Sequence, residues 1–368
     1  MIMYDKTLMR NWAKDIIPFT PELEDLPVKD IMTRLNLTKV AKLSFNEAPQ
    51  GPSPLAVKAI QEAALSPNLY PDASALELKT RLGELYKLPP AAFAVSNGAD
   101  EMIVLLTQAF LNEGEEVVIP FPTFGQYFVS TRLMGAKAVK VPLTDFTIDL
   151  EKVREGITDK TKMIILCNPN NPTGTIIPGK QLTAFIRNLP AHILLVVDEA
   201  YAEYADSYDF QSIIPLTAKF PNIIAVRTFS KIYGLAACRV GYAVASPPVI
   251  QALNQVKPPF NLNVFAQAGA AAALQDQNYI ADLKKYNTAA KIQLYKYLDR
   301  LNLSYVKSQA NFVFFNARKD GKEVFNYLAA DGIMVRTAHG WGYPAFIRLT
   351  IGSPEDMEMF YDSFRSLY

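Results

Sequence analysis

One short segment of the chain combines the side chains whose chemistry is most distinctive. Arg227-Thr228-Phe229-Ser230-Lys231 places a lysine beside two hydroxyls, and Arg239 follows eight residues after the lysine. Hydroxyls and a guanidinium can bind a phosphate, and a lysine amine can form an imine with an aldehyde. A solvated basic loop would have a similar composition, but this segment directly follows an apolar run that is typical of a buried strand. That position favours a functional site.

Two further segments carry polar groups at comparable positions. Asp198-Glu199-Ala200-Tyr201 supplies an acid and a phenol after an apolar run, with capping of the next helix as the alternative role of the acid. Ser96-Asn97-Gly98-Ala99-Asp100-Glu101 opens a helix, and its small residues would let a phosphate approach the free N–H groups of the first turn. Capping by Asn97 or Asp100 is the commoner use of such residues.

A fourth polar segment is richer in side-chain amides. Cys167-Asn168-Pro169-Asn170-Asn171-Pro172-Thr173-Gly174 contains two X-Pro steps and a glycine, which make a rigid turn. A rigid turn alone would not need three asparagines. Their side-chain amides are spaced to hydrogen-bond a ligand held above a sheet.

The elements that position these segments alternate along the chain. Between residues 90 and 250, short β-rich runs alternate with helix-length segments, which predicts a mostly parallel sheet between helices in an α/β domain. The expected strands are at residues 92–95, 117–119, 138–141, 163–166, 193–197 and 223–226. Ligands bind at the carboxyl ends of such strands, so the four segments should face one ligand. A phosphate site, an acid, a phenol and an amine together describe a site for pyridoxal 5′-phosphate.

Beyond residue 260 the pattern changes to a smaller α+β unit. We expect helices at residues 279–301, 321–330 and 354–366, and strands at 312–315, 333–335 and 346–350. The predicted organisation is an N-terminal segment (1–43) that packs on the small domain, a large domain (44–260) and a small C-terminal domain (261–368).

Composition excludes several classes of protein. The 368 residues include 37 Lys and Arg against 36 Asp and Glu, so the net charge of +1 creates no field that would attract nucleic acid or a membrane surface. Two cysteines and two histidines make a metal site of nitrogen and sulfur ligands nearly impossible. We find no secretion signal, and no apolar run approaches the roughly 20 residues that span a bilayer. We therefore expect a soluble, cytoplasmic protein.

The order and spacing of these motifs resemble those of a known family over nearly the whole chain. The chain is similar to the class II, fold-type-I aminotransferases that use pyridoxal phosphate, and among them to the histidinol-phosphate aminotransferase family. This resemblance implies a large domain with a mostly parallel seven-stranded sheet. It rests on Phe45–Pro54, Tyr70–Asp72, Asn97–Glu101, Pro122–Phe124, Asn170–Gly174, Asp198–Tyr201, Thr228–Lys231, Arg239–Tyr242 and Ile347–Gly352.

The resemblance implies three catalytic residues. Lys231 would form the imine with the cofactor and later move a proton between the substrate's α-carbon and the cofactor. Asp198 would pair with the pyridinium nitrogen, and Tyr201 would hydrogen-bond the ring oxygen together with Asn171. Holding the ring nitrogen protonated makes the ring an electron sink.

Further residues would bind the cofactor. Phe124 occupies the position of an aromatic ring stacked on the pyridine. Tyr70 resembles a tyrosine that reaches the partner subunit's cofactor phosphate, which implies a homodimer with shared active sites; a surface turn is the plainer interpretation. The cofactor phosphate itself would lie on the backbone amides of Ala99 and Asp100 and on the side chains of Thr228, Ser230 and Arg239.

At the substrate end, the resemblance implies two arginines and two amides. Arg348 would grip the anionic group of either substrate, because a guanidinium fork suits both a carboxylate and a phosphate ester. Arg336 would contact a substrate phosphate, and Asn46 and Asn171 would line the substrate site. The chain departs from the family pattern at Phe19 (commonly tyrosine), at Ala48 (commonly asparagine) and in the aromatic loop 338–343.

These features predict transamination between L-histidinol phosphate and 2-oxoglutarate, giving imidazole acetol phosphate and L-glutamate in histidine biosynthesis. The nearest alternative is an aromatic-amino-acid aminotransferase, which would replace phosphate contacts by apolar ones. A second alternative is a pyridoxal-phosphate-dependent decarboxylase of phosphorylated amino acids, because the sequence does not determine how the substrate is oriented.

Overall fold

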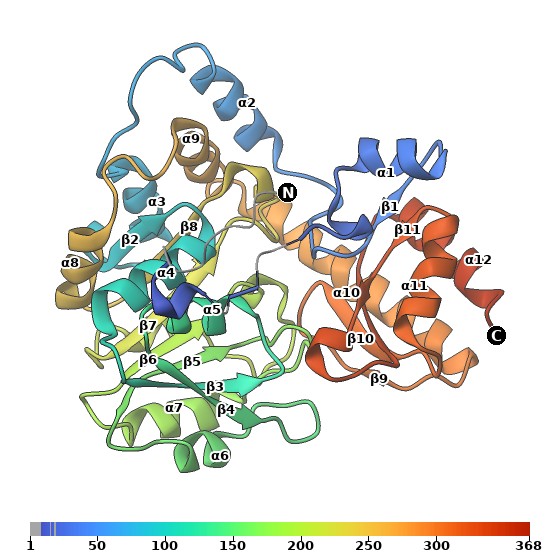
Figure 1. The fold of residues 1–368 in the computed structure, drawn as a ribbon. Helices are drawn as coiled ribbons and strands as arrows, with labels where there is room; N and C mark the ends of the chain where they lie inside the picture. Colours follow the sequence, from blue (N-terminus) through green and yellow to red (C-terminus); the bar gives the residue numbers. More distant parts are fainter. Residues whose placement is uncertain (1–8, 15, 18–19) are drawn as a thin grey trace.

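A seven-stranded sheet forms the centre of the larger part of the protein in this computed structural model, which describes residues 9–14, 16–17 and 20–368 (Figure 1). The strand order is β2-β8-β7-β6-β5-β3-β4; β8 runs antiparallel to both neighbours, and the other pairs are parallel. The predicted mostly parallel sheet is therefore confirmed. Its strands are β2 (Phe93–Ser96), β3 (Glu116–Phe121), β4 (Lys137–Pro142), β5 (Thr161–Cys167), β6 (Leu194–Asp198), β7 (Ile223–Thr228) and β8 (Gly241–Val244).

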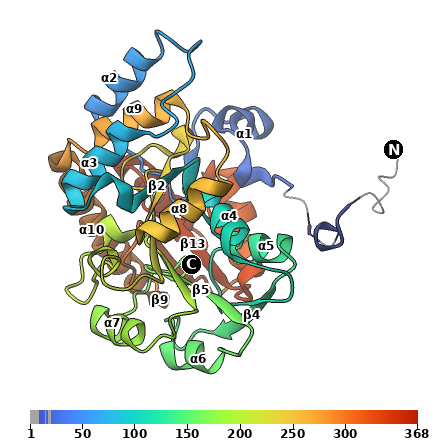
Figure 2. The ribbon, with the colours of Figure 1, turned by 90° about the vertical axis from the view of Figure 1, so that its left-hand side faces the viewer.

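Helices cover both faces of this sheet because successive side chains of its apolar strands point to opposite sides. One face packs with α4 (Gly98–Phe110), α5 (Gln126–Leu133) and α8 (Pro247–Val256), which lie together in Figure 2. The other face packs with α2 (Pro54–Ala63), α3 (Leu76–Tyr86), α6 (Leu150–Glu155), α7 (Gly179–Arg187) and α9 (Val264–Ala273).

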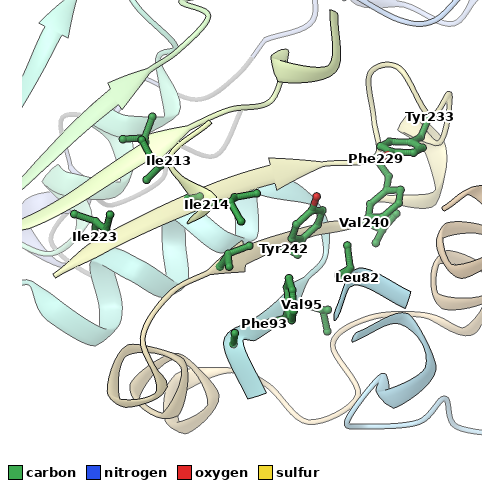
Figure 3. Close-up of a cluster of buried hydrophobic side chains, with 14 of the residues drawn as sticks. Leu82, Phe93, Val95, Ile213, Ile214, Ile223, Phe229, Tyr233, Val240 and Tyr242 are labelled. Carbon is green, nitrogen blue, oxygen red and sulfur yellow. The ribbon is translucent and has the colours of Figure 1, made fainter. Parts of the chain in front are cut away.

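Figure 3 shows the part of the core that supports the lysine segment. Phe229 packs on Tyr242 and Tyr233, with ring centroids 5.6 and 4.7 Å apart, and Tyr242 packs on Phe93 at 6.4 Å. All four rings are buried. Because Phe229 directly precedes Ser230, this packing fixes where the polar residues after β7 emerge from the sheet.

A four-stranded antiparallel sheet and three helices form the smaller unit, which is the predicted α+β unit with one strand more than expected. Its strands lie in the order β12-β13-β10-β9. The elements are β9 (Tyr305–Val306), β10 (Phe312–Asn316), β12 (Arg336–Thr337), β13 (Phe346–Thr350), α10 (Gln277–Arg300), α11 (Gly321–Ala330) and α12 (Pro354–Arg365).

The expected strand at residues 333–335 is the shorter β11, and a separate strand, β12, follows it at Arg336. β11 (Ile333–Met334) pairs in parallel with β1 (Ala41–Lys42), whereas β12 pairs with β13 in the four-stranded sheet. The partner of β11 comes from the other end of the chain, so the local sequence pattern could not reveal the division.

The domain boundaries at residues 43 and 260 stay a prediction. α1 (Val28–Leu35) and β1 share a hydrophobic cluster with the smaller unit through Ile31 and Ala41. α10 contributes Ile280 to the core of the larger unit and Leu294 to that of the smaller unit, so one helix connects the two cores. Among the described residues, no helix is long and apolar enough to cross a membrane.

Candidate active site

Three of the four polar segments converge because the strands before them, β5, β6 and β7, lie side by side in the sheet. The fourth follows β2, and Asp100 in it pairs with Arg239 at 3.1 Å. Asp198, the last residue of β6, lies opposite Cys167 of β5 and Val226 of β7 in the sheet register. The amide-rich turn follows β5, and the lysine segment follows β7 after Thr228. In Figure 1 the carboxyl end of β3 points toward the smaller unit. The site therefore lies at the edge of the sheet that the sequence predicts.

Lys231 lies in the centre of this group. Its Nζ donates a hydrogen bond to the carbonyl of Phe45 at 3.0 Å and lies 5.7 Å from the centroid of the Tyr201 ring. Burial, with the nearby positive charge of Arg348 as the second cause, lowers the pKa of Lys231 from 10.5 to about 8. The amine is thus easier to deprotonate than an ordinary lysine.

Asp198 is a buried acid held by two donors. The hydroxyl of Tyr127 donates to Oδ2 at 2.7 Å, and the backbone N–H of Ala200 donates to Oδ1 at 3.0 Å. Burial raises the pKa of Asp198 from 3.8 to about 6, while both hydrogen bonds oppose the rise. In the part of the chain that the structure describes, no lysine or arginine forms an ion pair with this carboxylate. Its charge is therefore available to a cationic ligand group.

Tyr201 is held by contacts with Asn46 and Phe312. Its Oη accepts a hydrogen bond from Asn46 Nδ2 at 3.0 Å, and its ring meets Phe312 edge to face at 5.2 Å. Asn46 is itself held by Thr350, whose hydroxyl donates to Asn46 Oδ1 and accepts from Asn46 N, both at 3.0 Å. The predicted phenol and one predicted substrate-site amide therefore lie side by side.

The predicted phosphate ligands also lie together. Arg239 Nη1 donates to Ser230 Oγ at 3.2 Å, and the Thr228 hydroxyl donates to the same oxygen at 3.0 Å. Arg239 Nη2 also pairs with Asp100 Oδ2 at 3.1 Å. Any side chain at Gly98, whose φ is +83°, would collide with the Arg239 guanidinium.

The start of α4, beside Arg239, could also bind a phosphate. Among the described residues no side chain caps the first N–H groups of α4, whereas Ser53 caps α2. A Cβ at Gly241 would lie 2.6 Å from the backbone nitrogen of Ala99, so this close approach requires glycine. Free N–H groups, hydroxyls and a guanidinium are the groups that hold a phosphate.

Arg348 is a buried cation on β13. Its Nη1 donates to Asn171 Oδ1 and its Nη2 to the carbonyl of Ser44, while its Nε is buried without a partner. The guanidinium carbon lies 5.4 Å from the ring centroids of Phe312 and Trp341. Burial lowers the pKa of Arg348 to about 10. The arginine is therefore held by neutral groups, and its Nε–H, which has no partner among the described residues, remains for an anion.

Three further predicted site residues make other contacts. Phe124 is half-buried and edge-on to Tyr127, at 5.6 Å. Arg336 pairs with Asp25 at 3.0 Å, although it lies directly opposite Arg348 in the strand register.

Tyr70 is 83% exposed, and its ring contacts Phe260 at 4.9 Å. The structure does not bring Tyr70 to the site of its own chain. Phe19 lies outside the described residues.

A model of the family "Aminotransferase class I and II" matches residues 38–364. The chain belongs to this family. It is 39% identical over 353 residues to the histidinol-phosphate aminotransferase of Moorella thermoacetica, covering 96% of this chain and 92% of that one. It is 40% identical over 349 residues to the enzyme of the same name from Caldicellulosiruptor saccharolyticus, covering 95% and 97%.

A solved structure agrees with this assignment. The histidinol-phosphate aminotransferase of Sinorhizobium meliloti, in complex with pyridoxal-5′-phosphate, superposes with a TM-score of 0.86 at 28% identity, covering 96% of this chain and 99% of that one. The prediction of a fold-type-I aminotransferase that uses pyridoxal phosphate is confirmed.

The side chains of this aminotransferase fit the cofactor. The uncapped start of α4 with Arg239 suits a phosphate, the unpaired buried charge of Asp198 suits a protonated ring nitrogen, and the lowered pKa of Lys231 suits bonding to an aldehyde. The individual residue roles stay a prediction.

Sequence reasoning missed two groups that hold the catalytic residues. Tyr127, which anchors Asp198, lies at the start of α5, three residues after Phe124, and a second aromatic residue close behind the predicted ring residue was the available signal. The Phe45 carbonyl that binds Lys231 carried no signal, because any residue has a backbone carbonyl.

The pKa of Lys231 gives a direct test of this site. Competitive acetylation of the apoprotein across a pH series, read by peptide mass spectrometry, should give Lys231 a midpoint near 8 rather than 10.5. In Arg348→Gln the midpoint should rise, because a neighbouring positive charge is removed. Exposed lysines of the same chain serve as the internal standard. A midpoint near 10.5 in the unaltered chain would contradict the electrostatics described above.

Proposed function

We propose that this aminotransferase moves the amino group of L-histidinol phosphate to 2-oxoglutarate, giving imidazole acetol phosphate and L-glutamate in histidine biosynthesis. The observation that carries the proposal is the pair Arg336 and Arg348, which lie directly opposite each other on neighbouring strands. Side chains opposite each other in an antiparallel pair point to the same face. Two guanidinium groups on one face of the sheet suit a substrate with a dianionic phosphate. The names of the curated relatives support the same substrate.

The cofactor, when bound, supplies a ring that withdraws electrons from the substrate's reacting carbon. Asp198 would keep the ring nitrogen protonated, with Tyr127 and Ala200 fixing its two oxygens. The Nζ of Lys231 would accept the α-proton and return it, a role that requires the neutral amine and so is favoured by a pKa of about 8.

The remaining cofactor contacts form a frame around these groups. We propose that Tyr201 and Asn171 donate to the ring oxygen and that Phe124 packs on the ring. The phosphate would be held by the amides of Ala99 and Asp100 and by Thr228, Ser230 and Arg239. Because the hydroxyls and the guanidinium already contact one another, little reorganisation is needed to bind an anion there.

Arg348 would bind the anionic group of both substrates through its free Nε, with Asn46 and Asn171 beside it. Arg336 makes its contacts with Asp25 and Glu24 through Nη1, at 3.0 and 3.5 Å. A guanidinium has five N–H donors, so the others remain for a substrate phosphate. The N-terminal segment, through Asp25, would thus hold Arg336 in place before the substrate arrives.

An aromatic-amino-acid aminotransferase is the second candidate. The observation that favours it is the apolar environment of Arg348, which lies between the rings of Phe312 and Trp341. Such a surface would accept a substrate ring, whereas a phosphate needs the second arginine. The two candidates therefore differ in the role they give to Arg336.

We also propose that the protein is a homodimer in which the two chains share their active sites, and that it is cytoplasmic. Tyr70 is presented by a fixed turn, because Asp72 accepts hydrogen bonds from the N–H groups of Ser74 and Leu76 at 2.8 Å. An exposed tyrosine on such a turn suits contact with a second copy. The unpaired Cys167 and Cys238 suit a reducing compartment.

The role of Arg336 can be tested by comparing donors. In Arg336→Ala, kcat/KM for histidinol phosphate should fall by about one to two powers of ten, as expected for losing a charge-assisted hydrogen bond of roughly 1.5–3 kcal/mol. Glutamate should be used almost normally, because Arg348 alone satisfies a carboxylate. Asp25→Asn, which keeps the arginine and its pair with Glu24 but removes the pair with Asp25, is the matched control and should lose much less kcat/KM for histidinol phosphate than Arg336→Ala. Preference of the unaltered enzyme for phenylalanine or tyrosine, with a silent Arg336→Ala, would replace this proposal by the second candidate.

Subunit mixing tests the shared site. Tyr70→Ala and Lys231→Ala chains should each be inactive, but a mixed dimer contains one site free of both changes. Random pairing puts half of the dimers in this form, so about a quarter of the wild-type activity should return. Tyr208→Ala, at an exposed tyrosine with no assigned role, should stay active. Mixed dimers that native mass spectrometry detects and that remain inactive would refute a role of Tyr70 in trans.

A further inference from the structure

The aromatic loop between β12 and β13 has no role in the function proposed so far. It forms a short 3-10 helix, η8 (His339–Trp341), followed by Gly342 in the left-handed region with φ of +83°. This turn places Trp341, which is half-buried, between the smaller unit and the residues that follow β3.

Trp341 contacts both units through different parts of its indole ring. The ring face lies 5.4 Å from the guanidinium carbon of Arg348, and its edge meets Phe314 at 6.4 Å. The indole Nε1–H donates to the carbonyl of Thr123 at 3.2 Å. Thr123 directly precedes Phe124, the ring expected to lie on the cofactor. One side chain therefore joins the substrate arginine to the cofactor side of the site.

A second aromatic contact between the units lies beside Trp341. Phe146, in the loop after β4, packs on Phe314, Tyr343 and Phe346 with ring centroids 6.1, 5.5 and 5.5 Å away. Tyr343 follows Trp341 in the same loop. The loop thus packs against the larger unit at two places, through Trp341 and through Tyr343. Of these two residues, Trp341 is the one that also contacts Arg348.

Arg348 needs such support because of how it is held. Its described partners are the neutral oxygens of Asn171 and Ser44, and no carboxylate is among them. A cation between two aromatic faces is attracted by the ring quadrupoles, and this attraction strengthens where water is excluded. Removing one ring would leave the guanidinium less fixed and more open to water.

We propose that Trp341 is a positioning residue that holds Arg348 in register with the cofactor-bearing sheet through its bond to Thr123. This inference rests on the proposed role of Arg348 as the anion-binding arginine. It predicts that Trp341 acts on both half-reactions equally, because Arg348 serves both. If Trp341 instead contacted the ring of the amino donor directly, its substitution would change the kinetics of that donor only.

Two variants separate the contacts of the indole. Trp341→Phe keeps a ring over Arg348 but loses the N–H donor, and Trp341→Ala loses both. The KM for glutamate should rise about threefold in the first and about tenfold or more in the second, with smaller changes in kcat. Histidinol phosphate should show the same ratios. Wild-type KM values for glutamate in both variants, or a change confined to one donor, would overturn the proposal.

A spectroscopic measurement gives a readout independent of turnover. The chain has two tryptophans, so in Trp12→Phe the tryptophan emission, excited at wavelengths that tyrosine does not absorb, comes from Trp341 alone. Titrating inorganic phosphate into this holoprotein should change the emission, and the response should vanish when Arg348→Gln is added. An unchanged emission, with calorimetry showing Arg348-dependent phosphate binding, would refute the coupling. Neither the KM for glutamate nor the fluorescence titration requires histidinol phosphate. Both tests of Trp341 therefore remain valid if the enzyme does not use histidinol phosphate.

Discussion

A buried carboxylate at the end of the central strand is the constraint on which the site depends. Asp198 is removed from water, and its only described partners are the Tyr127 hydroxyl and the Ala200 N–H. Two hydrogen bonds lower the cost of a buried charge but do not neutralise it, and its pKa of about 6 reflects that balance. A protonated pyridine nitrogen would supply the missing positive charge, so this buried carboxylate suits the cofactor.

The opposite face of the same strands secures this carboxylate. Glu199 and Arg227 neighbour Asp198 and Thr228 in sequence, and successive side chains of a strand point to opposite sides. There Arg227 pairs with Glu199 at 2.7 Å and, through Nη1, with Glu203. A buried pair of this kind fixes a unique arrangement more than it adds stability. The ends of β6 and β7 are thereby held in one register while their other face binds the ligand.

Much of this arrangement could be predicted from local sequence, and the remainder depends on distant parts of the chain. Apolar runs located the strands, and the turn residues after them located Asp198 and Lys231. The bond from Lys231 to Phe45 spans 186 residues, and the pairing of β1 with β11 joins the two ends of the chain, so neither has a local signal. Arg336 was predicted by resemblance, but its ion pair with Asp25 requires the folded N-terminal segment.

Lys231 is the residue that we propose bonds the cofactor. Reducing the holoprotein with borohydride fixes the cofactor to its lysine, and peptide mass spectrometry then locates the added phosphopyridoxyl group. The group should be found on the peptide that contains Lys231 and on no other at one equivalent of cofactor per chain. A label on a different lysine, or none in a protein that retains the cofactor, would contradict the site described here.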